Sequence, residues 1–178
     1  LKRSHPIPKG TPIYEELSKF INYSWGSVGK DGTFSPYFPG PQPISIERKH
    51  LGGLGRARYM ACEKTDGIRM AIVCKLIGDR KYTVVVNRAM EMHSVKFYMS
   101  RTAYNGTILD GEFVGDKFMI YDAVMVGGMS VKHMNLDTRL GHVVPFIKSI
   151  MAMPTDPFTI RLKTFYPIME MQELIRKV

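Results

Sequence analysis

The residues best suited to chemistry lie in one short stretch, Lys64-Thr65-Asp66-Gly67-Ile68-Arg69. A lysine amine can attack phosphorus only when it has lost its proton, and nearby cations or loss of solvent favour that neutral form. Arg69, Arg88 and a bound divalent metal ion can supply such cations. Gly67 permits a tight turn that brings Lys64 and Arg69 to the same ligand. The stretch therefore suggests a nucleophilic lysine that acts on a nucleotide.

The same six residues also fit a strand–turn–strand with an exposed lysine, because Asp-Gly is a common turn pair. Polar residues further along the chain favour the chemical interpretation: Asp110-Gly111-Glu112 lies in one predicted strand and Tyr121-Asp122 in the next. Unpaired carboxylates are costly to bury, whereas a ribose hydroxyl or a magnesium ion would use their oxygens. Tyr121 offers a flat face for a base, although an aromatic residue half-buried in a hairpin is equally ordinary.

The elements that must position these residues are mostly strands. Runs rich in β-branched and apolar residues predict them, with turns at Gly78-Asp79 and Gly115-Asp116. Their hairpin arrangement predicts an α+β fold with a largely antiparallel sheet. The predicted strands are Tyr59–Lys64, Ile68–Leu76, Tyr82–Asn87, Thr107–Val114, Phe118–Val124 and Phe158–Thr164.

Helices are predicted around this sheet. Thr11-Pro12 is typical of a helix start and predicts a helix to about Phe20, followed by an irregular Gly- and Pro-rich stretch over 26–43. Apolar residues from Leu140 to Met151 recur at helical spacing, and Pro145 should kink or split that helix. A closing helix is predicted over Glu170–Lys177.

Length and composition narrow the class of protein. The 178 residues predict one domain over 1–178, with a helix and lead-in over 1–43 and a sheet core over 44–178. The net charge of +9 favours polyanionic partners, although a solubilising surface explains it too. No apolar run suits a bilayer, and no signal sequence is evident. Cys62 and Cys74 are predicted to be buried free thiols, and no protein metal site is predicted.

Several segments together resemble one known family. From about Tyr37 onward, the chain resembles the nucleotidyltransferase domain of mRNA capping enzymes, which are GTP:RNA guanylyltransferases of the superfamily shared with DNA and RNA ligases. The first of these segments resembles one that precedes the nucleophile in cellular capping enzymes and is missing from ligases. The segments are Phe38–Ser45, Cys62–Arg69, Asn87-Arg88, Leu109–Glu112, Met119–Asp122 and Pro157–Lys163.

The resemblance implies a role for each matching residue. Asp66 would fix the turn, and Asp110 and Asp122 would be structural. The functional roles are Lys64 as the nucleophile that becomes guanylylated, Arg69 for the ribose, Glu112 for the ribose or the metal network, Arg88 for sugar or phosphate, Tyr121 stacked on guanine, and Lys163 at guanine O6.

The resemblance also implies ligands and surroundings. The expected substrates are GTP, with Mg²⁺ or Mn²⁺, and the 5′-diphosphate end of nascent RNA. RNA polymerase or other capping subunits are expected partners, and a membrane is not. The nucleus is the expected location, or the cytoplasm for a viral protein. The sheet core over 44–178 would be the GTP-binding part.

Two alternatives remain open on sequence alone. One is an ATP-dependent RNA or DNA ligase that adenylates the same lysine, and the other is a non-catalytic nucleotide- or RNA-binding fragment. The chain ends at Val178, where the family's fourth motif would begin. We therefore expect a truncated domain without the family's OB-fold, and little complete activity from this chain by itself.

Overall fold

The protein forms two compact units. We describe it from a computed structural model, over residues 1–54, 56–171 and 176. Unit 1 combines Leu1–Gly40 with Gly67–Leu162, and unit 2 combines Pro41–Asp66 with Lys163–Val178. The single domain expected over 1–178, with its lead-in over 1–43 and core over 44–178, stays a prediction.

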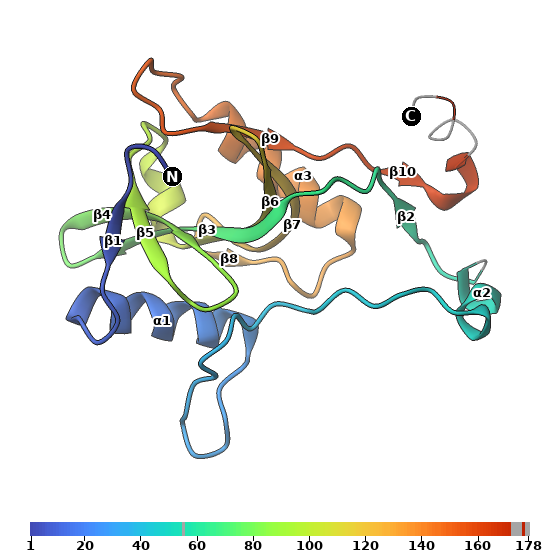
Figure 1. Ribbon diagram of the computed structural model, residues 1–178, viewed down its shortest axis with the longest axis horizontal. Helices are drawn as coiled ribbons and strands as arrows, with labels where there is room; N and C mark the ends of the chain where they lie inside the picture. The colour runs from blue at the N-terminus through green and yellow to red at the C-terminus, as the bar shows by residue number, and fades with distance from the viewer. Residues whose placement is uncertain (55, 172–175, 177–178) are drawn as a thin grey trace. The chain divides into compact units, whose positions relative to one another are not determined.

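Unit 1 is built on an eight-stranded sheet (Figure 1). The strand order is β1-β5-β4-β3-β6-β7-β8, all antiparallel, and β9 adds to β7 in parallel. The α+β fold with a largely antiparallel sheet is thereby confirmed. The strands are β1 (His5–Ile7), β3 (Ile68–Ile77), β4 (Arg80–Val86), β5 (Met92–Val95), β6 (Thr107–Val114), β7 (Lys117–Val126), β8 (Met129–Ser130) and β9 (Thr159–Leu162).

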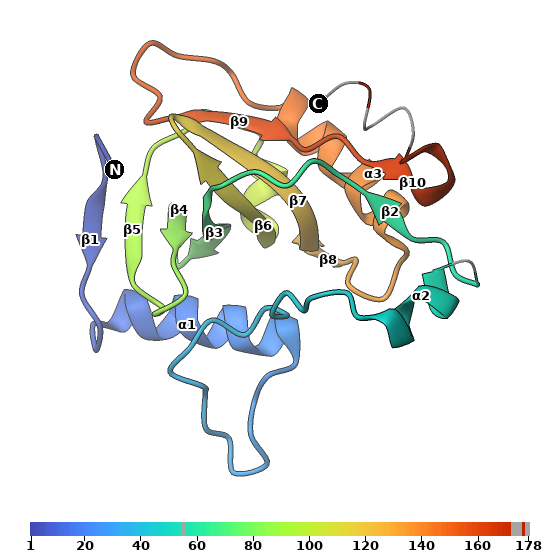
Figure 2. The same cartoon turned by 45° about the vertical axis from the view of Figure 1, so that its right-hand side comes forward.

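A helix packs on each face of this sheet (Figure 2). Helix α1 (Pro12–Trp25) buries Leu17 and Ile21 against Ala71, Val84 and their neighbours. Helix α3 (Leu136–Lys148) buries Val143 and Phe146 on the other face, with a short 3₁₀ turn, η1 (Arg101–Asn105). Successive residues of a strand point to opposite faces of the sheet, so the residues of β3 and β6 divide between these two cores.

Unit 2 contains short elements. Helix α2 (Arg48–Leu54) is followed by β2 (Met60–Ala61), which pairs antiparallel with β10 (Tyr166–Pro167). A 3₁₀ turn, η2 (Ile168–Glu170), comes next. The predicted strand Tyr59–Lys64 is therefore wrong beyond Met60–Ala61, and Cys62 lies after the strand rather than in it. The helix predicted over Glu170–Lys177 lies mostly outside the described residues.

Two helix predictions also need correction. Helix α1 runs to Trp25 rather than Phe20, because Leu17, Ile21 and other residues continue to pack on the sheet. Helix α3 is not split at Pro145, which lies inside it. A proline inside a helix lacks a backbone donor and crowds the carbonyl four residues earlier, but the buried Val143 and Phe146 hold the helix on the core on either side.

No helix within residues 1–54, 56–171 and 176 is long and apolar enough to span a membrane. Both cysteines are free thiols. Cys74 is fully buried in β3, as predicted, whereas Cys62 is only partly buried.

Candidate active site

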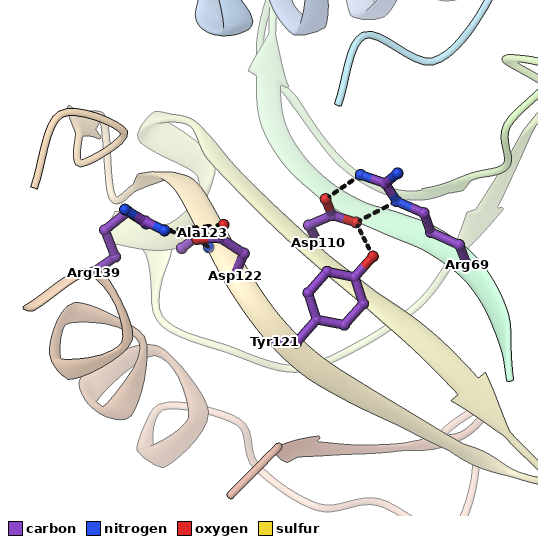
Figure 3. Close-up of polar contacts among 6 residues, drawn as sticks. All are labelled: Arg69, Asp110, Tyr121, Asp122, Ala123 and Arg139. Carbon is purple, nitrogen blue, oxygen red and sulfur yellow. Dashed lines mark hydrogen bonds and ion pairs between the residues drawn. The ribbon is translucent and has the colours of Figure 1, made fainter. Parts of the chain in front are cut away.

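The centre of the candidate site in unit 1 is a buried carboxylate, that of Asp110 on β6 (Figure 3). Arg69 on β3 donates two hydrogen bonds to it, from Nε at 3.2 Å and from Nη2 at 2.7 Å. The Tyr121 hydroxyl donates a third, at 3.0 Å. The Asp110 side chain is 3% exposed and that of Arg69 is 14% exposed. Asp110 therefore fixes both an arginine and a tyrosine for which the sequence predicts contacts with a nucleotide.

Register explains why these side chains meet. Arg69 pairs with Glu112 across β3 and β6, and Ala71 pairs with Asp110. Directly opposed residues share a face, and so do residues two apart along a strand. Arg69, Asp110 and Glu112 therefore lie on the face that α1 covers, where Ala71 is part of the core. The motif residues of β3 and β6 are brought together as the sequence predicts.

A β-bulge places Tyr121 in the same cluster. Asp110 pairs with Asp122 and Gly111 with Ile120, so Tyr121 is an extra residue in β7. A bulge sets two residues of one strand opposite one residue of the neighbouring strand, so both Tyr121 and Asp122 lie beside Asp110. Tyr121 contacts Asp110, while Asp122 forms an ion pair with Arg139 of α3, with 2.7 Å between Arg139 Nε and Asp122 Oδ1 (Figure 3).

Burial sets the protonation behaviour of this cluster. Burial raises the pKa of the Asp110 carboxyl above its usual value and outweighs the opposing effect of Arg69. Burial and the charge of Asp110 raise the pKa of Tyr121 well above that of an ordinary tyrosine. Burial disfavours the charged form of Arg69, but its hydrogen bonds to Asp110 and the charge of that carboxylate outweigh this effect and raise the pKa of Arg69. The tyrosine hydroxyl therefore keeps its proton and remains a donor at neutral pH.

Phe38 and Gly40, at the end of the first segment of unit 1, also lie close to Arg69. The guanidinium carbon lies 5.1 Å from the centre of the Phe38 ring, a cation–π contact, and Phe38 is 5% exposed. A Cβ atom at Gly40 would come within 2.6 Å of Arg69 Nη2, so this close approach requires glycine. Trp25 packs edge-on against Phe38 at 4.9 Å between ring centres. Arg69 is thus held from two sides, by Asp110 and by Phe38.

Gly67 shows why glycine follows Asp66 in the motif. A Cβ atom there would lie 2.7 Å from the Phe113 carbonyl oxygen and 2.7 Å from Glu112 Oε2. The chain can therefore enter β3 beside Glu112 only without a side chain at this position. Glu112 itself is partly buried next to that entry point.

Arg88 follows β4 in the turn toward β5. Its side chain is exposed, and its backbone carbonyl accepts a hydrogen bond from the Phe38 amide at 3.1 Å. The Asn87 side chain orders this turn: its oxygen accepts from the amides of Ala89 and Glu91, each at 3.0 Å. Arg88 thus adjoins the Phe38 segment through its backbone, and its contact with a nucleotide stays a prediction.

Lys64 and Lys163 belong to unit 2. The Lys64 side chain is 88% exposed and forms an ion pair with Asp66 at 3.0 Å. Lys163 Nζ donates a hydrogen bond to the Thr65 hydroxyl at 3.0 Å. Lys163 therefore contacts Thr65 and Lys64 contacts Asp66, which are consecutive residues of the motif. The ion pair of Lys64 is too exposed to contribute much stability, so it leaves the amine available to a ligand.

A divalent metal ion fits this set of residues only together with a nucleotide. In the part of the chain that the structure describes, no group of three or more His, Cys, Asp or Glu side chains could hold a metal ion. Nucleotide-binding proteins commonly hold Mg²⁺ with one or two carboxylates and the substrate phosphates. Glu112, on the face of the sheet that carries Arg69, is suited to that limited role.

Sequence reasoning missed three contacts of the site. The role of Asp110 as the shared anchor of Arg69 and Tyr121 depends on register and on a bulge, which the motif does not reveal. The expectation that Asp110 and Asp122 are structural agrees with their ion pairs, but Arg139 was not identified as a partner. Phe38 was noted only as part of a motif, and no sequence signal pointed to its contact with Arg69.

Comparisons with known proteins identify the family. The family described as "mRNA capping enzyme, catalytic domain" matches residues 9–178. The chain is 32% identical over 148 residues to the mRNA-capping enzyme subunit alpha of Schizosaccharomyces pombe, covering 72% of this chain and 36% of that protein. It is 31% identical over 156 residues to the subunit alpha of Neurospora crassa, covering 76% and 36%. It is 27% identical over 158 residues to the mRNA-capping enzyme of Danio rerio, covering 78% and 26%.

These matches show that the chain belongs to the mRNA capping enzyme catalytic domain family. The resemblance drawn from the motifs is thereby confirmed. The chain spans about a third of the length of the two fungal relatives and about a quarter of the fish protein.

Proposed function

We propose that this protein is an mRNA guanylyltransferase that uses a covalent lysyl-GMP intermediate. The observation that carries the proposal is the Lys64–Arg69 motif within a chain that matches the family over residues 9–178. The cluster of Arg69, Glu112 and Tyr121 around Asp110 supports it, because these side chains share one face of the sheet.

In the proposed first step, the Lys64 amine attacks the α-phosphorus of GTP. The new N–P bond forms as the bond to the bridging oxygen of the β-phosphate breaks, pyrophosphate leaves, and the amine releases its proton to solvent. In the second step, a terminal phosphate oxygen of 5′-diphosphate RNA attacks the same phosphorus, the N–P bond breaks, and the Lys64 nitrogen takes up a proton from solvent as it leaves. Mg²⁺ or Mn²⁺ would neutralise charge on the phosphates, with Glu112 as its protein contact.

The remaining residues would bind and orient the nucleotide. Arg69 would hold the ribose, and Asp110 and Phe38 restrict the orientations that its guanidinium can take. The hydrogen bond to Asp110 fixes the Tyr121 ring, as a stacking partner for guanine requires. Arg88 would contact sugar or phosphate.

Lys163 would select guanine over adenine. Guanine presents an acceptor, O6, at the position where adenine presents an amino donor. A lysine ammonium donates and cannot accept, so it favours guanine. The bond of Lys163 to Thr65 keeps its Nζ beside the nucleophile motif within unit 2.

The test is covalent labelling in a setting that supplies the rest of a capping enzyme. The chain would replace the matching segment of the S. pombe relative, and the chimera would be incubated with α-labelled GTP or ATP and Mg²⁺ or Mn²⁺. We expect an acid-labile adduct with GTP alone on a denaturing gel. Lys64→Ala should abolish it, while Lys30→Ala, at another exposed lysine, should not.

Other outcomes would overturn the proposal. Labelling by ATP and not by GTP would indicate a ligase-type adenylyltransferase. A folded chimera that forms no adduct would indicate a nucleotide- or RNA-binding module. If the proposal holds, the 5′ end of nascent RNA is the acceptor, and RNA polymerase or other capping subunits are candidate partners. The site of action would then be the nucleus, or the cytoplasm for a viral protein.

A further inference from the structure

A pocket outside the candidate active site lies in unit 1, where β5 separates from β4. The ladder between β4 and β5 runs over Thr83–Val86, whereas the ladder between β4 and β3 continues to Arg80. After β5 the chain leaves the sheet, and Tyr98 forms an isolated bridge with Met151. The divergence leaves a pocket of about 590 Å³, which we call the β4 pocket. Its volume is in the range of small-ligand sites.

The lining of the β4 pocket is basic and aromatic. Arg80, Lys81 and Lys96 line it, and none of its described lining residues is an Asp or Glu. Tyr98 is 43% exposed and Met151 is 65% exposed, so flat and apolar surface is open to a ligand. Each cation lies over a tyrosine ring: Arg80 over Tyr82 at 5.8 Å, Lys81 over Tyr104 at 5.4 Å and Lys96 over Tyr98 at 5.1 Å.

This pocket is separate from the cluster around Asp110. Tyr104 and Thr83 of the pocket lie on the face of the sheet that α3 covers, where Tyr104 belongs to the core. Asp110 lies on the face that α1 covers, two residues from the buried Ile108 of that core. A ligand in the β4 pocket would therefore not contact the Asp110 cluster.

We propose that the β4 pocket binds single-stranded RNA through nucleotides other than the reacting 5′ end. Sequence-tolerant sites for single strands combine aromatic rings, on which bases stack, with cations that contact the phosphates. The three cations beside tyrosine rings match that combination, and the net charge of +9 has the sign that RNA requires. An acidic peptide would use the cations but leave the open Tyr98 face without a base to stack on it.

Direct binding tests this proposal without any guanylyl transfer. The probe is an unstructured, uridine-rich 20-nucleotide RNA with a 5′-hydroxyl and a 3′ fluorescent label, and the readout is anisotropy at several salt concentrations. Lys81→Ala with Lys96→Ala should reduce the slope of log affinity against log salt by about 1.4, which corresponds to two phosphate contacts. Tyr98→Ala should weaken binding about tenfold. The matched control, Lys30→Ala with Lys117→Ala, removes the same charge from exposed positions outside the pocket.

The outcomes separate this proposal from the proposed function. Lys64→Ala should bind the RNA like the original protein, because the probe needs no nucleophile. Equal weakening in the control and in the pocket variant, with unchanged melting temperatures, would overturn the proposal. Pocket-dependent binding of a phosphoserine peptide without binding of the RNA would also overturn it and assign the pocket to an acidic protein segment.

Discussion

Replacing Asp110 by asparagine tests whether the buried carboxylate anchors the site. Asp110 and Arg69 are 3% and 14% exposed, and the amide would leave the guanidinium without its counter-charge. Breaking a buried ion pair from one side costs about 3–5 kcal/mol. The amide oxygen still accepts one hydrogen bond, so we expect the lower end, about 3 kcal/mol. In a protein of this size that lowers Tm by about 6–12 °C.

Asp122→Asn is the matched control for this experiment. It removes the same charge from an ion pair whose side chains are 29% and 19% exposed, and solvent screens that pair more strongly. We expect a loss of about 1 kcal/mol, or about 2–4 °C in Tm. The assay is thermal unfolding followed by circular dichroism for both variants. Equal shifts in Tm would refute the argument that burial makes the Arg69–Asp110 pair special.

The remaining predictions concern local packing and proton release. Gly67→Ala places a Cβ atom 2.7 Å from the Phe113 carbonyl, so thermal unfolding should show a loss of about 1–3 kcal/mol; unchanged stability would contradict the close approach. The raised pKa of Tyr121 means that its contribution to stability is present below about pH 10 and is lost as pH rises through its folded-state value. Absorbance titration at 295 nm should therefore show no difference between the original protein and Tyr121→Phe up to pH 10, and an earlier difference would count against it. Burial raises the pKa of the Cys74 thiol to about 12, so at pH 8 a thiol reagent should rapidly modify Cys62 alone. Rapid modification of Cys74 in the Cys62→Ser variant would contradict this prediction.

The sequence predicted the central hairpins well because their signals are local. Thr107–Val114 is β6 to the residue, and the Gly78-Asp79 and Gly115-Asp116 turns lie where expected. Alternating or continuous apolar runs and turn pairs carry that information within a few residues. The strand over Tyr59–Lys64 was overestimated, because whether a short apolar run pairs depends on a partner, here β10, far along the chain.

The sequence predicts which residues form the candidate site, but it does not predict which of them contact each other. The motif places Arg69, Glu112 and Tyr121 on neighbouring strands, which the sheet confirms. That Arg69 and Tyr121 share one carboxylate follows from strand register and from an extra residue in β7, and neither is encoded in motif spacing. The edge strand β1 was missed because three residues give too short a pattern to detect.

Because β7 contains an extra residue, the side-chain contacts on both faces of the sheet depend on the number of residues in this strand. Deleting Tyr121 would restore strict alternation between Ile120 and Ala123, and Asp122 would then turn toward Asp110. That change would set two carboxylates side by side and leave Arg139 without its ion-pair partner. Most substitutions in β7 alter one side chain, whereas this single deletion would change the contacts on the face that α1 covers and on the face that α3 covers. We therefore expect the fold to tolerate most substitutions in β7 better than the deletion of Tyr121.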